Sequence, residues 1–387
     1  MVAACPYPAR RGTPIRIRRL AEGMVALGHQ VHVVTYHFGS GDSDSTLSVH
    51  RIPSISRYRR LSPGPTWVKL ALLDPLLTLK LWQVLRKVRV DVIHAHHYEG
   101  LLVAGAARLR SRIPVIFDAH TLLTSELPFY HLGLPVRVKR RIGATLDRRL
   151  PAIADHVITV TERIRTRLLQ IGRLPEEQIS VVPNGVESRF FSENGHGSTG
   201  RPNGHPTLIF TGNLAPYQGI DLMLQALRKV LNCRSDVRLK IVTESSFAGY
   251  DGLARELGVF GAIELVKAPF EELPNLLAGA TIAVNPRIDC DGIPVKLLNY
   301  MAAGKPVLSF AGSAPGVRHR QTGWLVPDGD VDGFAEGALT LIGNAELATA
   351  LGQNAQRQVK DQHDWNRSAE LAERVYRRVI RERATAR

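Results

Sequence analysis

Short runs of apolar, mostly β-branched residues alternate along the chain with longer segments of helical period. The runs cover residues 2–5, 31–35, 92–95, 115–117, 157–160 and 179–182 in the first half, and 207–211, 239–243, 263–266, 282–285, 307–310 and 324–326 in the second. Near-continuous apolar runs of this length are typical of strands buried on both faces of a parallel sheet. The alternation therefore predicts an α/β protein with two doubly wound sheets built from βαβ units.

Helical periodicity fills the segments between these strands. The expected helices cover residues 14–27, 101–109, 136–150, 221–231, 252–257, 273–277, 295–303 and 364–383. Ligands of open α/β sheets bind outside the carboxyl ends of the strands. We expect two Rossmann-like domains that face each other across a cleft, with the ligand bound at the strand ends that face it. The first run is short for an interior strand, which leaves open whether Met1 is the natural start.

A polar, glycine-rich segment divides the chain near its middle. Residues 194–205, NGHGSTGRPNGH, contain no large apolar side chain, which is the composition of a linker. The 387 residues of the chain also exceed the ~250–300 residues at which one hydrophobic core stops growing. We predict an acceptor-side domain of residues 1–193, the linker, a nucleotide-binding domain of residues 206–363, and a helical tail of residues 364–387 that can pack back on the first domain.

The net charge of +15 is concentrated in the first half. Residues 1–200 hold 28 Lys and Arg against 15 Asp and Glu, whereas residues 201–387 hold 22 against 20. Such a one-sided field attracts a polyanion, either nucleic acid or an anionic lipid leaflet. The sequence has no zinc ligands, RNA-binding strand signature or basic zipper, so we expect no nucleic-acid partner. The three widely spaced cysteines form neither a disulfide framework nor a metal site.

Residues 134–150, LPVRVKRRIGATLDRRL, place six basic residues and one Asp among apolar residues, as in an interfacial helix. Basic residues within 57–60 and 108–112 extend this charge.

Lys69, Asp74 and Lys80 interrupt the longest apolar stretch, residues 67–85. A membrane-spanning helix needs about 20 predominantly apolar residues, so we expect none here. Without a signal-peptide pattern, we expect a cytoplasmic protein bound peripherally to the inner face of the cell membrane. A solvated basic face is the alternative.

The strongest local signal for chemistry is the segment IPVKLLNYMAAGKPV at 293–307. A loop leads here into a helix that Gly304 and Pro306 end. A helix start beside a strand end directs free N–H groups and a positive dipole at an anion such as a diphosphate. Lys296 in the first turn adds a full positive charge. A solvated lysine on an ordinary helix is the alternative interpretation.

This segment resembles the donor-binding segment of the retaining glycosyltransferases of family 4 (glycosyl transferases group 1), which have the GT-B fold. Stretches similar to that family follow in the same order: RGTP at 11–14, LGHQVHVVT at 27–35, DVIHAH at 91–96, FDAH at 117–120, ADHVITV at 154–160, VPNGV at 182–186, FTGNL at 210–214, YQGID at 217–221 and TGWLV at 322–326. The resemblance implies a metal-independent enzyme without a cofactor. Its partners would be a nucleotide-sugar donor and a lipid-linked or glycan acceptor, with retention at the anomeric carbon.

The resemblance also suggests site residues. The catalytic candidates are His120, Asp291 and Lys296, and the donor-binding candidates are Gly12, Thr13, Arg16, Gly212, Asn213, Gln218, Arg287, Gly292, Ile293, Pro294, Leu297 and Asn299. His120 ends the FDAH stretch, where the family's histidine lies beside the transferred sugar. A neutral imidazole there can hydrogen-bond a sugar hydroxyl or stabilise developing charge.

Two departures from the family pattern change the expected chemistry. The family's pair of glutamates, with seven residues between them, is replaced by Asp291 and Asn299, which can still accept hydrogen bonds from sugar and ribose hydroxyls. The Arg and Lys that the family places on the donor diphosphate are replaced by Asn213 and Gln218. Charge-assisted hydrogen bonds are roughly twice as strong as neutral ones, so other cations are needed. We nominate Lys296, Arg287 and either Arg16 or Arg18.

Two alternatives stay open on the sequence. A nucleotide-sugar epimerase of the same fold would keep the donor site and need no second substrate. A non-catalytic glycan-binding or scaffold protein would explain the uncharged Asn213 and Gln218. The histidines His94, His96 and His97 invite a metal interpretation, but they lack the partner carboxylates of a catalytic site in the sequence nearby, so we expect no metal.

Overall fold

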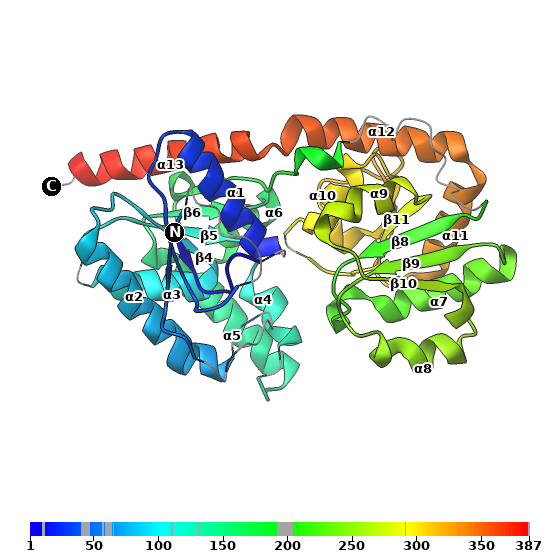
Figure 1. Cartoon of the computed structure of the whole chain (residues 1–387), viewed down its shortest axis with the longest axis horizontal. Coiled ribbons are helices and arrows are strands. Elements are labelled where there is room, and N and C mark those ends of the chain that lie inside the picture. The colour runs from blue at the N-terminus through cyan, green and yellow to red at the C-terminus, as the bar shows by residue number, and fades with distance from the viewer. Residues whose placement is uncertain are drawn as a thin grey trace. The chain divides into compact units, whose positions relative to one another are not determined.

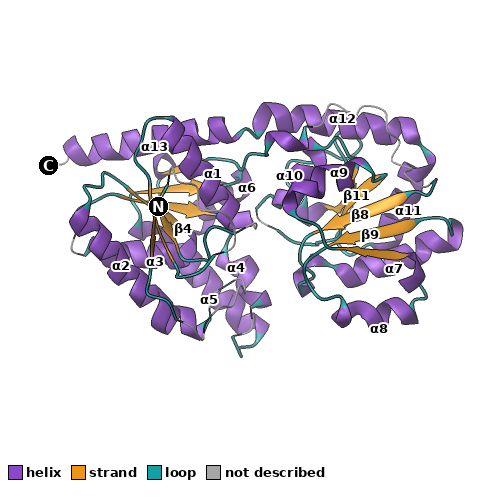
Figure 2. Cartoon of the chain, in the orientation of Figure 1, coloured by secondary structure: helices purple, strands orange, loops and turns teal. Residues whose placement is uncertain are grey.

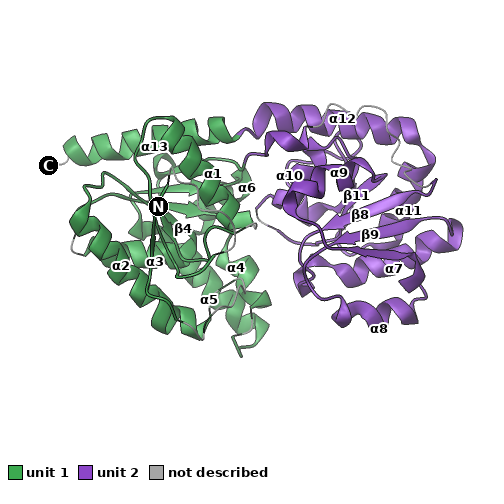
Figure 3. Ribbon diagram, in the orientation of Figure 1, with its two compact units in different colours: residues 1–184, 365–387 green, residues 185–364 purple. Residues whose placement is uncertain are grey.

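The computed structural model describes residues 1–9, 12–39, 47–55, 58, 64, 66–109, 111–130, 132–172, 174–191, 204–290 and 292–385. The chain forms two compact units, shown in Figure 3. Unit 1 comprises Met1–Asn184 and Trp365–Arg387, and unit 2 comprises Gly185–Asp364. Residues 194–203 of the predicted linker lie outside the described residues. Asp291 also lies outside them.

Unit 1 contains a seven-stranded parallel sheet in the order β3-β2-β1-β4-β5-β6-β7. Its central strands β4, β5 and β6 are labelled in Figure 1. Its strands are β1 (Val2–Ala3), β2 (His32–Thr35), β3 (Ser48–Arg51), β4 (Ile93–His96), β5 (Val115–Ala119), β6 (His156–Thr159) and β7 (Ile179–Val181). The order reverses between β1 and β4, which is the switch point where ligands bind in doubly wound sheets. Strand β3 was missed in the sequence because it is a polar edge strand, whose partly exposed residues need no continuous apolar run.

Helices cover both faces of this sheet, as Figure 2 shows. They are α1 (Gly12–Ala26), α2 (Asp74–Lys87) after the π-helical turn η1 (Lys69–Leu73), α3 (His97–Arg108), α4 (Leu123–Glu126), α5 (Val136–Arg149), α6 (Glu162–Ile171) and α13 (Trp365–Thr385). Strand side chains alternate between the two faces. Phe117 packs in the core that α2, α3 and α6 cover, whereas Ile116 and Ile158 pack against Leu20 of α1 and Val375 of α13.

The C-terminal helix α13 belongs to unit 1, although it follows the last element of unit 2 in the sequence. It lies against α1 at a position where an added Cβ on Gly23 would be 2.5 Å from the Cβ of Ala369. Glycine therefore allows the two helices to approach closely. None of the helices in the described part of the chain combines the length and apolar character needed to cross a bilayer.

Unit 2 contains a six-stranded parallel sheet in the order β10-β9-β8-β11-β12-β13. Its strands are β8 (Thr207–Thr211), β9 (Arg238–Val242), β10 (Ile263–Val266), β11 (Ile282–Asn285), β12 (Val307–Phe310) and β13 (Trp324–Val326). Its helices are α7 (Ile220–Cys233), α8 (Ala248–Glu256), α9 (Leu273–Ala278), α10 (Val295–Ala302), α11 (Val331–Gly343) and α12 (Ala345–Gln362). The order reverses between β8 and β11. The prediction of two doubly wound parallel sheets is confirmed.

Candidate functional site

In unit 2, predicted donor-binding residues follow the strands on either side of the switch point. Gly212 and Asn213 come directly after β8, and Arg287 comes two residues after β11. Gly219, before α7, has a φ of 69°, and a Cβ added to it would collide with the carbonyl oxygen of Pro286. Only glycine lets the loop after β8 lie this close to the loop after β11.

Hydrogen bonds connect polar side chains within the loop after β8 and join that loop to Lys296 at the start of α10. Lys296 Nζ donates to Gln218 Oε1 at 2.8 Å, and Gln218 Nε2 donates to Asn213 Oδ1 at 3.4 Å. Asn213 Nδ2 donates to the hydroxyl of Tyr217 at 3.1 Å. The guanidinium of Arg287 lies 4.9 Å from the centre of the Tyr217 ring. The structure thus brings together four residues that were predicted to bind the donor, although they come from three separate segments.

Lys296 is the central cation of this set. Its side chain is partly buried, and Nζ lies 4.0 Å from the centre of the Phe210 ring. Burial, with a smaller contribution from the positive charge of Arg287, holds the pKa of Lys296 well below its usual value. An anion bound beside Lys296 would favour its protonated form. A diphosphate bound here would therefore raise the pKa of Lys296.

Helix α10 begins after Pro294, near the end of β8. The hydroxyl of Tyr300 on α10 accepts a hydrogen bond from the backbone N–H of Thr211 at 2.7 Å, which holds the helix against that strand. The N-terminal end of α10 is the positive end of its dipole, and Lys296 lies in this first turn. The sequence-based expectation of a helix start in this segment is met, and the helix runs from Val295 to Ala302.

The remaining predicted donor residues around α10 differ in what they can offer a ligand. Leu297 is fully buried in the core, and its backbone N–H donates to the carbonyl of Pro294 at 2.9 Å, so its side chain is a packing group. Asn299 is buried on the same helix. Gly292 is buried and Ile293 is partly buried in the turn before α10. Asp291 lies outside the described residues, so its role stays a prediction.

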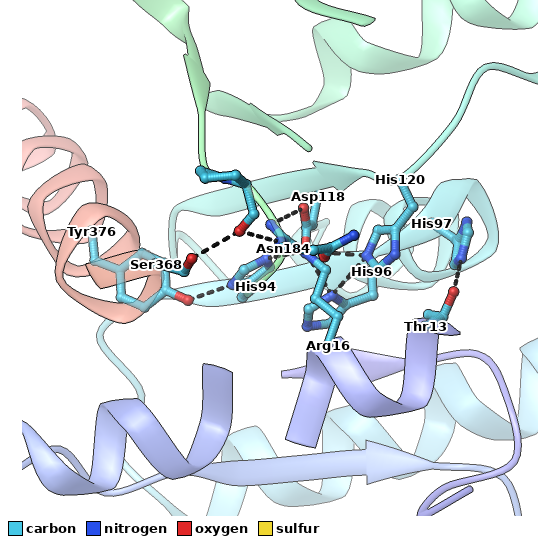
Figure 4. Close-up of polar contacts among 11 residues, drawn as sticks. Thr13, Arg16, His94, His96, His97, Asp118, His120, Asn184, Ser368 and Tyr376 are labelled. Carbon is cyan, nitrogen blue, oxygen red and sulfur yellow. Dashed lines mark hydrogen bonds and ion pairs between the residues drawn. The ribbon is translucent and has the colours of Figure 1, made fainter. Parts of the chain in front are cut away.

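In unit 1, a cluster of ionisable side chains lies on one face of the sheet (Figure 4). His94 and His96 are two residues apart on β4, and His96 is the register partner of Asp118 on β5. The period of two along a strand therefore directs all three side chains to the face covered by α1 and α13. Tyr376 of α13 reaches this face, where its hydroxyl hydrogen-bonds to His94 Nδ1.

Arg16 of α1 forms a bidentate ion pair with Asp118 in this cluster. Its Nε donates to Oδ2 at 2.8 Å and its Nη2 donates to Oδ1 at 3.0 Å, with both side chains almost fully buried. Nη1 donates to Asn184 Oδ1 at 3.0 Å and to the carbonyl of Pro183 at 3.2 Å. The nomination of Arg16 as a diphosphate cation does not fit these contacts. Arg18, the other candidate, pairs with Glu22 at 2.7 Å.

Three histidine nitrogens surround the same carboxylate oxygen. Asp118 Oδ2 lies 3.3 Å from His94 Nε2, 3.0 Å from His96 Nδ1 and 3.1 Å from His120 Nε2. Burial lowers the pKa of all three histidines, that of His120 to about 3. Burial alone would raise the pKa of Asp118, but Arg16 and His120 outweigh it and hold that pKa well below its usual range. The cluster therefore combines one carboxylate, one guanidinium and neutral imidazoles.

His120 itself lies at the carboxyl end of β5, beside the start of α1. Its ring stacks on His97 with 4.3 Å between ring centres, and His97 Nε2 hydrogen-bonds to Thr13 Oγ1 at 2.6 Å. The predicted Gly12, Thr13 and His120 are therefore close together in unit 1. His97 has a φ of 61°, a left-handed conformation that is uncommon for residues other than glycine. The sequence offered no signal for this backbone conformation.

The spacing of His94, His96 and Asp118 would allow a metal ion, since one ligand atom of each lies within 4.8 Å of the others. However, Arg16 already binds both oxygens of Asp118. A guanidinium this close would repel a metal cation and compete for its only anionic ligand. The arrangement is that of a charge-paired carboxylate rather than a metal-ligand set.

We expect the folded protein to lose stability as the pH falls from about 6.5 toward 3. The pKa of His120 is about 3 when folded, against about 6.5 for an unfolded histidine. Between these values the unfolded chain binds more protons, so the free energy of unfolding rises with pH. His156, with a pKa lowered by burial to about 4, has the same sign. Urea midpoints that stay constant between about pH 7 and 4.5 would contradict this expectation.

Comparisons with known proteins cover nearly the whole chain. Residues 10–190 match the model of Glycosyltransferase Family 4, and residues 205–344 match that of Glycosyl transferases group 1. An uncharacterized glycosyltransferase of Methanocaldococcus jannaschii is 25% identical over 388 residues, which cover 96% of each chain.

Solved structures of similar fold extend these matches. Sucrose-phosphate synthase of Thermosynechococcus elongatus superposes with a TM-score of 0.83 at 18% identity, and the superposition covers 98% of each chain. Anabaena HepE in complex with UDP-glucose gives a TM-score of 0.70 at 18% identity, with 97% of this chain and 98% of that one covered.

Proposed function

Since the chain belongs to the family 4 glycosyltransferases of the GT-B fold, we propose that it moves a sugar from a nucleoside-diphosphate sugar to a lipid-linked or glycan acceptor with retention of the anomeric configuration. The observation that carries this proposal is the connected set of Lys296, Gln218 and Asn213 at the switch point of unit 2. Ligands of doubly wound sheets bind at this position. A structural neighbour with UDP-glucose bound makes UDP-sugars the first donors to test.

Stabilisation of the leaving diphosphate is the main task of the site in unit 2. During transfer, the bond between the anomeric carbon and the phosphate oxygen breaks, and negative charge develops on the nucleoside diphosphate. Lys296, Arg287 and the start of α10 supply positive charge at the ends of β8 and β11. Interactions that strengthen as this charge develops accelerate the reaction. The uncharged Asn213 and Gln218 orient these groups and donate neutral hydrogen bonds.

We assign contact with the transferred sugar to His120 of unit 1. A carboxylate only accepts hydrogen bonds, so the His120 Nε2 that faces Asp118 carries the ring proton in the favoured tautomer. Nδ1 is then a hydrogen-bond acceptor for a sugar hydroxyl. Because the pKa of His120 is about 3, this acceptor stays available at neutral pH. The start of α1, with Gly12 and Thr13, supplies polar groups beside it.

The acceptor is proposed to be presented at a membrane surface on the cytoplasmic side. The support is the excess of 28 basic over 15 acidic residues in residues 1–200. An anionic leaflet attracts such a surface, with about 1 kcal/mol for each basic residue close to the lipid. No step of the proposed reaction uses a metal ion or a further cofactor.

Replacing Lys296 with Ala tests the donor site. We expect Lys296→Ala to weaken nucleoside-diphosphate binding about 10- to 100-fold, because a hydrogen bond to a charged group contributes about 1.5–3 kcal/mol. The measurement is titration calorimetry with UDP, GDP and their sugars, in two buffers that differ in ionisation enthalpy. Wild-type binding should take up protons, and the variant should lose that uptake.

Lys229→Ala is the matched control, because Lys229 lies on α7 of the same unit and pairs with Asp332 at the surface. Its nucleotide affinity should equal that of the wild type. If Lys296→Ala binds as tightly as Lys229→Ala, the assigned donor site is wrong. A wild-type protein that binds no nucleoside diphosphate would instead indicate a non-catalytic scaffold.

A further inference from the structure

Two neighbouring segments of unit 1 bury their lysines and expose their large apolar residues. Around η1, Lys69 is only 4% exposed, whereas Trp67 is 68% exposed. In α5, Lys139 is 8% exposed, whereas Val138 is 41% exposed. The exposed apolar residues of these segments are Trp67, Val68, Leu70 and Leu72 in the first, and Leu134, Val136, Val138 and Ile142 in the second. This is the reverse of the usual distribution in a water-soluble helix.

The buried lysines have structural partners, which explains why they lie inside. Lys139 Nζ donates to the carbonyls of Pro128 at 2.6 Å and Tyr130 at 3.0 Å. Lys69 Nζ donates to the carbonyl of Gly64 at 2.6 Å. A Cβ added to Gly64 would lie 2.5 Å from the Tyr130 ring, so these two residues are in contact. Lys69 thus fixes Gly64, Lys139 fixes Tyr130, and the contact between Gly64 and Tyr130 connects the η1 segment with the segment that leads into α5.

The buried residues of α5 are Lys139, Gly143 and Asp147, and Leu146 packs partly buried against the core beside them. A Cβ on Gly143 would lie 2.6 Å from the backbone nitrogen of Thr124, which shows how closely the helix approaches α4. Asp147 accepts hydrogen bonds from the backbone N–H groups of Leu123 and Thr124, both at 2.9 Å, and from the hydroxyl of Tyr98 at 2.5 Å. These polar contacts and Leu146 hold α5 in place, and its valines and isoleucine face outward.

Basic side chains surround the outward apolar residues of α5. The exposed basic residues are Arg137, Arg140, Arg141, Arg148 and Arg149. The only acidic residue in 134–149 is Asp147, which is fully buried, and residues 67–72 contain none. An exposed surface that combines apolar side chains with uncompensated arginines is complementary to the interfacial region of an anionic leaflet, which offers phosphate groups above acyl chains.

We propose that residues 67–72 and 134–149 form a lipid-docking face, which sets Trp67 and the outward side chains of α5 into an anionic membrane surface. Tryptophan is enriched at membrane interfaces, where its ring sits at the headgroup level. Arginine guanidinium groups bind the lipid phosphates around it. The inference rests on the proposed function in that a lipid-linked acceptor would be presented at this surface. It adds which elements contact the lipid and that apolar insertion contributes beside charge.

The test measures binding of the full chain to vesicles of phosphatidylcholine, with and without phosphatidylglycerol, by sedimentation. We expect the double variant Trp67→Ser/Val138→Ser and the double variant Arg140→Gln/Arg141→Gln each to lower partitioning onto anionic vesicles about tenfold. Added salt should weaken wild-type binding, because it screens the charge contribution. The arginine variant should depend less on salt, whereas the apolar variant should keep the wild-type dependence.

Control variants remove an exposed apolar side chain or two exposed charges from unit 2 instead. Leu265→Ser removes a residue of β10 that is 49% exposed, and Arg228→Gln/Lys229→Gln removes two exposed charges from α7. Both should bind vesicles like the wild type. Thermal unfolding checks that every variant is folded, which is expected because the replaced side chains are exposed.

Equal binding of all variants, or equal binding of the wild type to neutral and anionic vesicles, would overturn the proposal. A wild-type dimer in solution that Trp67→Ser/Val138→Ser abolishes would assign the face to a second copy of the chain instead. Nucleotide affinity is measured on the same samples. Lost vesicle binding with unchanged nucleotide affinity supports the docking face, whereas absent nucleotide binding in the wild type would contradict the proposed function and leave the vesicle result standing.

Discussion

Asp118→Asn is expected to lower the free energy of unfolding by about 3–5 kcal/mol, the cost of leaving one partner of a buried ion pair without the other. Asp118 is fully buried, and its carboxylate neutralises the guanidinium of Arg16 through two hydrogen bonds. Asparagine has nearly the same shape but no charge, so the cationic Arg16 would stay buried among neutral histidines. Urea denaturation at neutral pH measures the difference.

Asp251→Asn is the matched control for this substitution. Asp251 pairs with Arg255 at 2.9 Å, one turn along α8, but both side chains are largely exposed. An exposed pair of this kind contributes about 0.2–1 kcal/mol. If the two variants lose similar free energies of unfolding, the buried Arg16–Asp118 pair contributes no more to stability than an exposed pair, and the expectation is wrong. Retained stability in Asp118→Asn would also reopen the assignment of Arg16 to a bound diphosphate.

His120→Ala is expected to reduce kcat about 10²- to 10³-fold, which is the usual cost of removing one group that stabilises charge or orients substrate in a transition state. Nucleoside-diphosphate affinity should change little, because the proposal assigns that binding to unit 2. The measurement is release of nucleoside diphosphate from the nucleotide sugar identified by thermal shift, with calorimetry for affinity. Since the pKa of His120 is about 3, the pH profile of kcat should show no inflection from this histidine near pH 6–7.

His29→Ala serves as the control for His120→Ala. His29 also lies in unit 1 and pairs with Glu373, but its side chain is 39% exposed and it is remote in sequence from the β5 end. Its variant should keep wild-type turnover. Wild-type turnover in His120→Ala would remove this residue from the catalytic set without affecting the donor site proposed around Lys296.

The strands were predictable because a strand buried on both faces of a parallel sheet must be apolar along its whole length. All six strands of unit 2 begin and end within one residue of the predicted runs. Strand β3 and helices α2, α4, α6, α11 and α12 were not identified. For β3 the reason is its place at the sheet edge, where polar residues such as Ser48 and Arg51 are tolerated.

The candidate donor site was partly predictable for a local reason. Lys296 lies in the first turn of a helix whose start and stop signals are contiguous in the sequence, and Asn213 and Gln218 lie in the loop directly after a strand. What joins them is the hydrogen bond between Lys296 and Gln218, which are 78 residues apart. The sequence indicated each segment, but only the folded sheet places β8 beside β11.

The sequence by itself determined the buried strands, the start of α10 and which half of the chain is basic, because those properties depend on neighbouring residues. The tertiary structure decided whether a charged side chain is available or already paired. Arg16 looked like a free cation behind Gly12, yet Asp118, 102 residues away, binds it in the core. It also decided that Lys69 and Lys139 lie inside while Trp67 and Val138 lie outside. Burial and pairing depend on contacts between distant segments, and no local pattern contains those contacts.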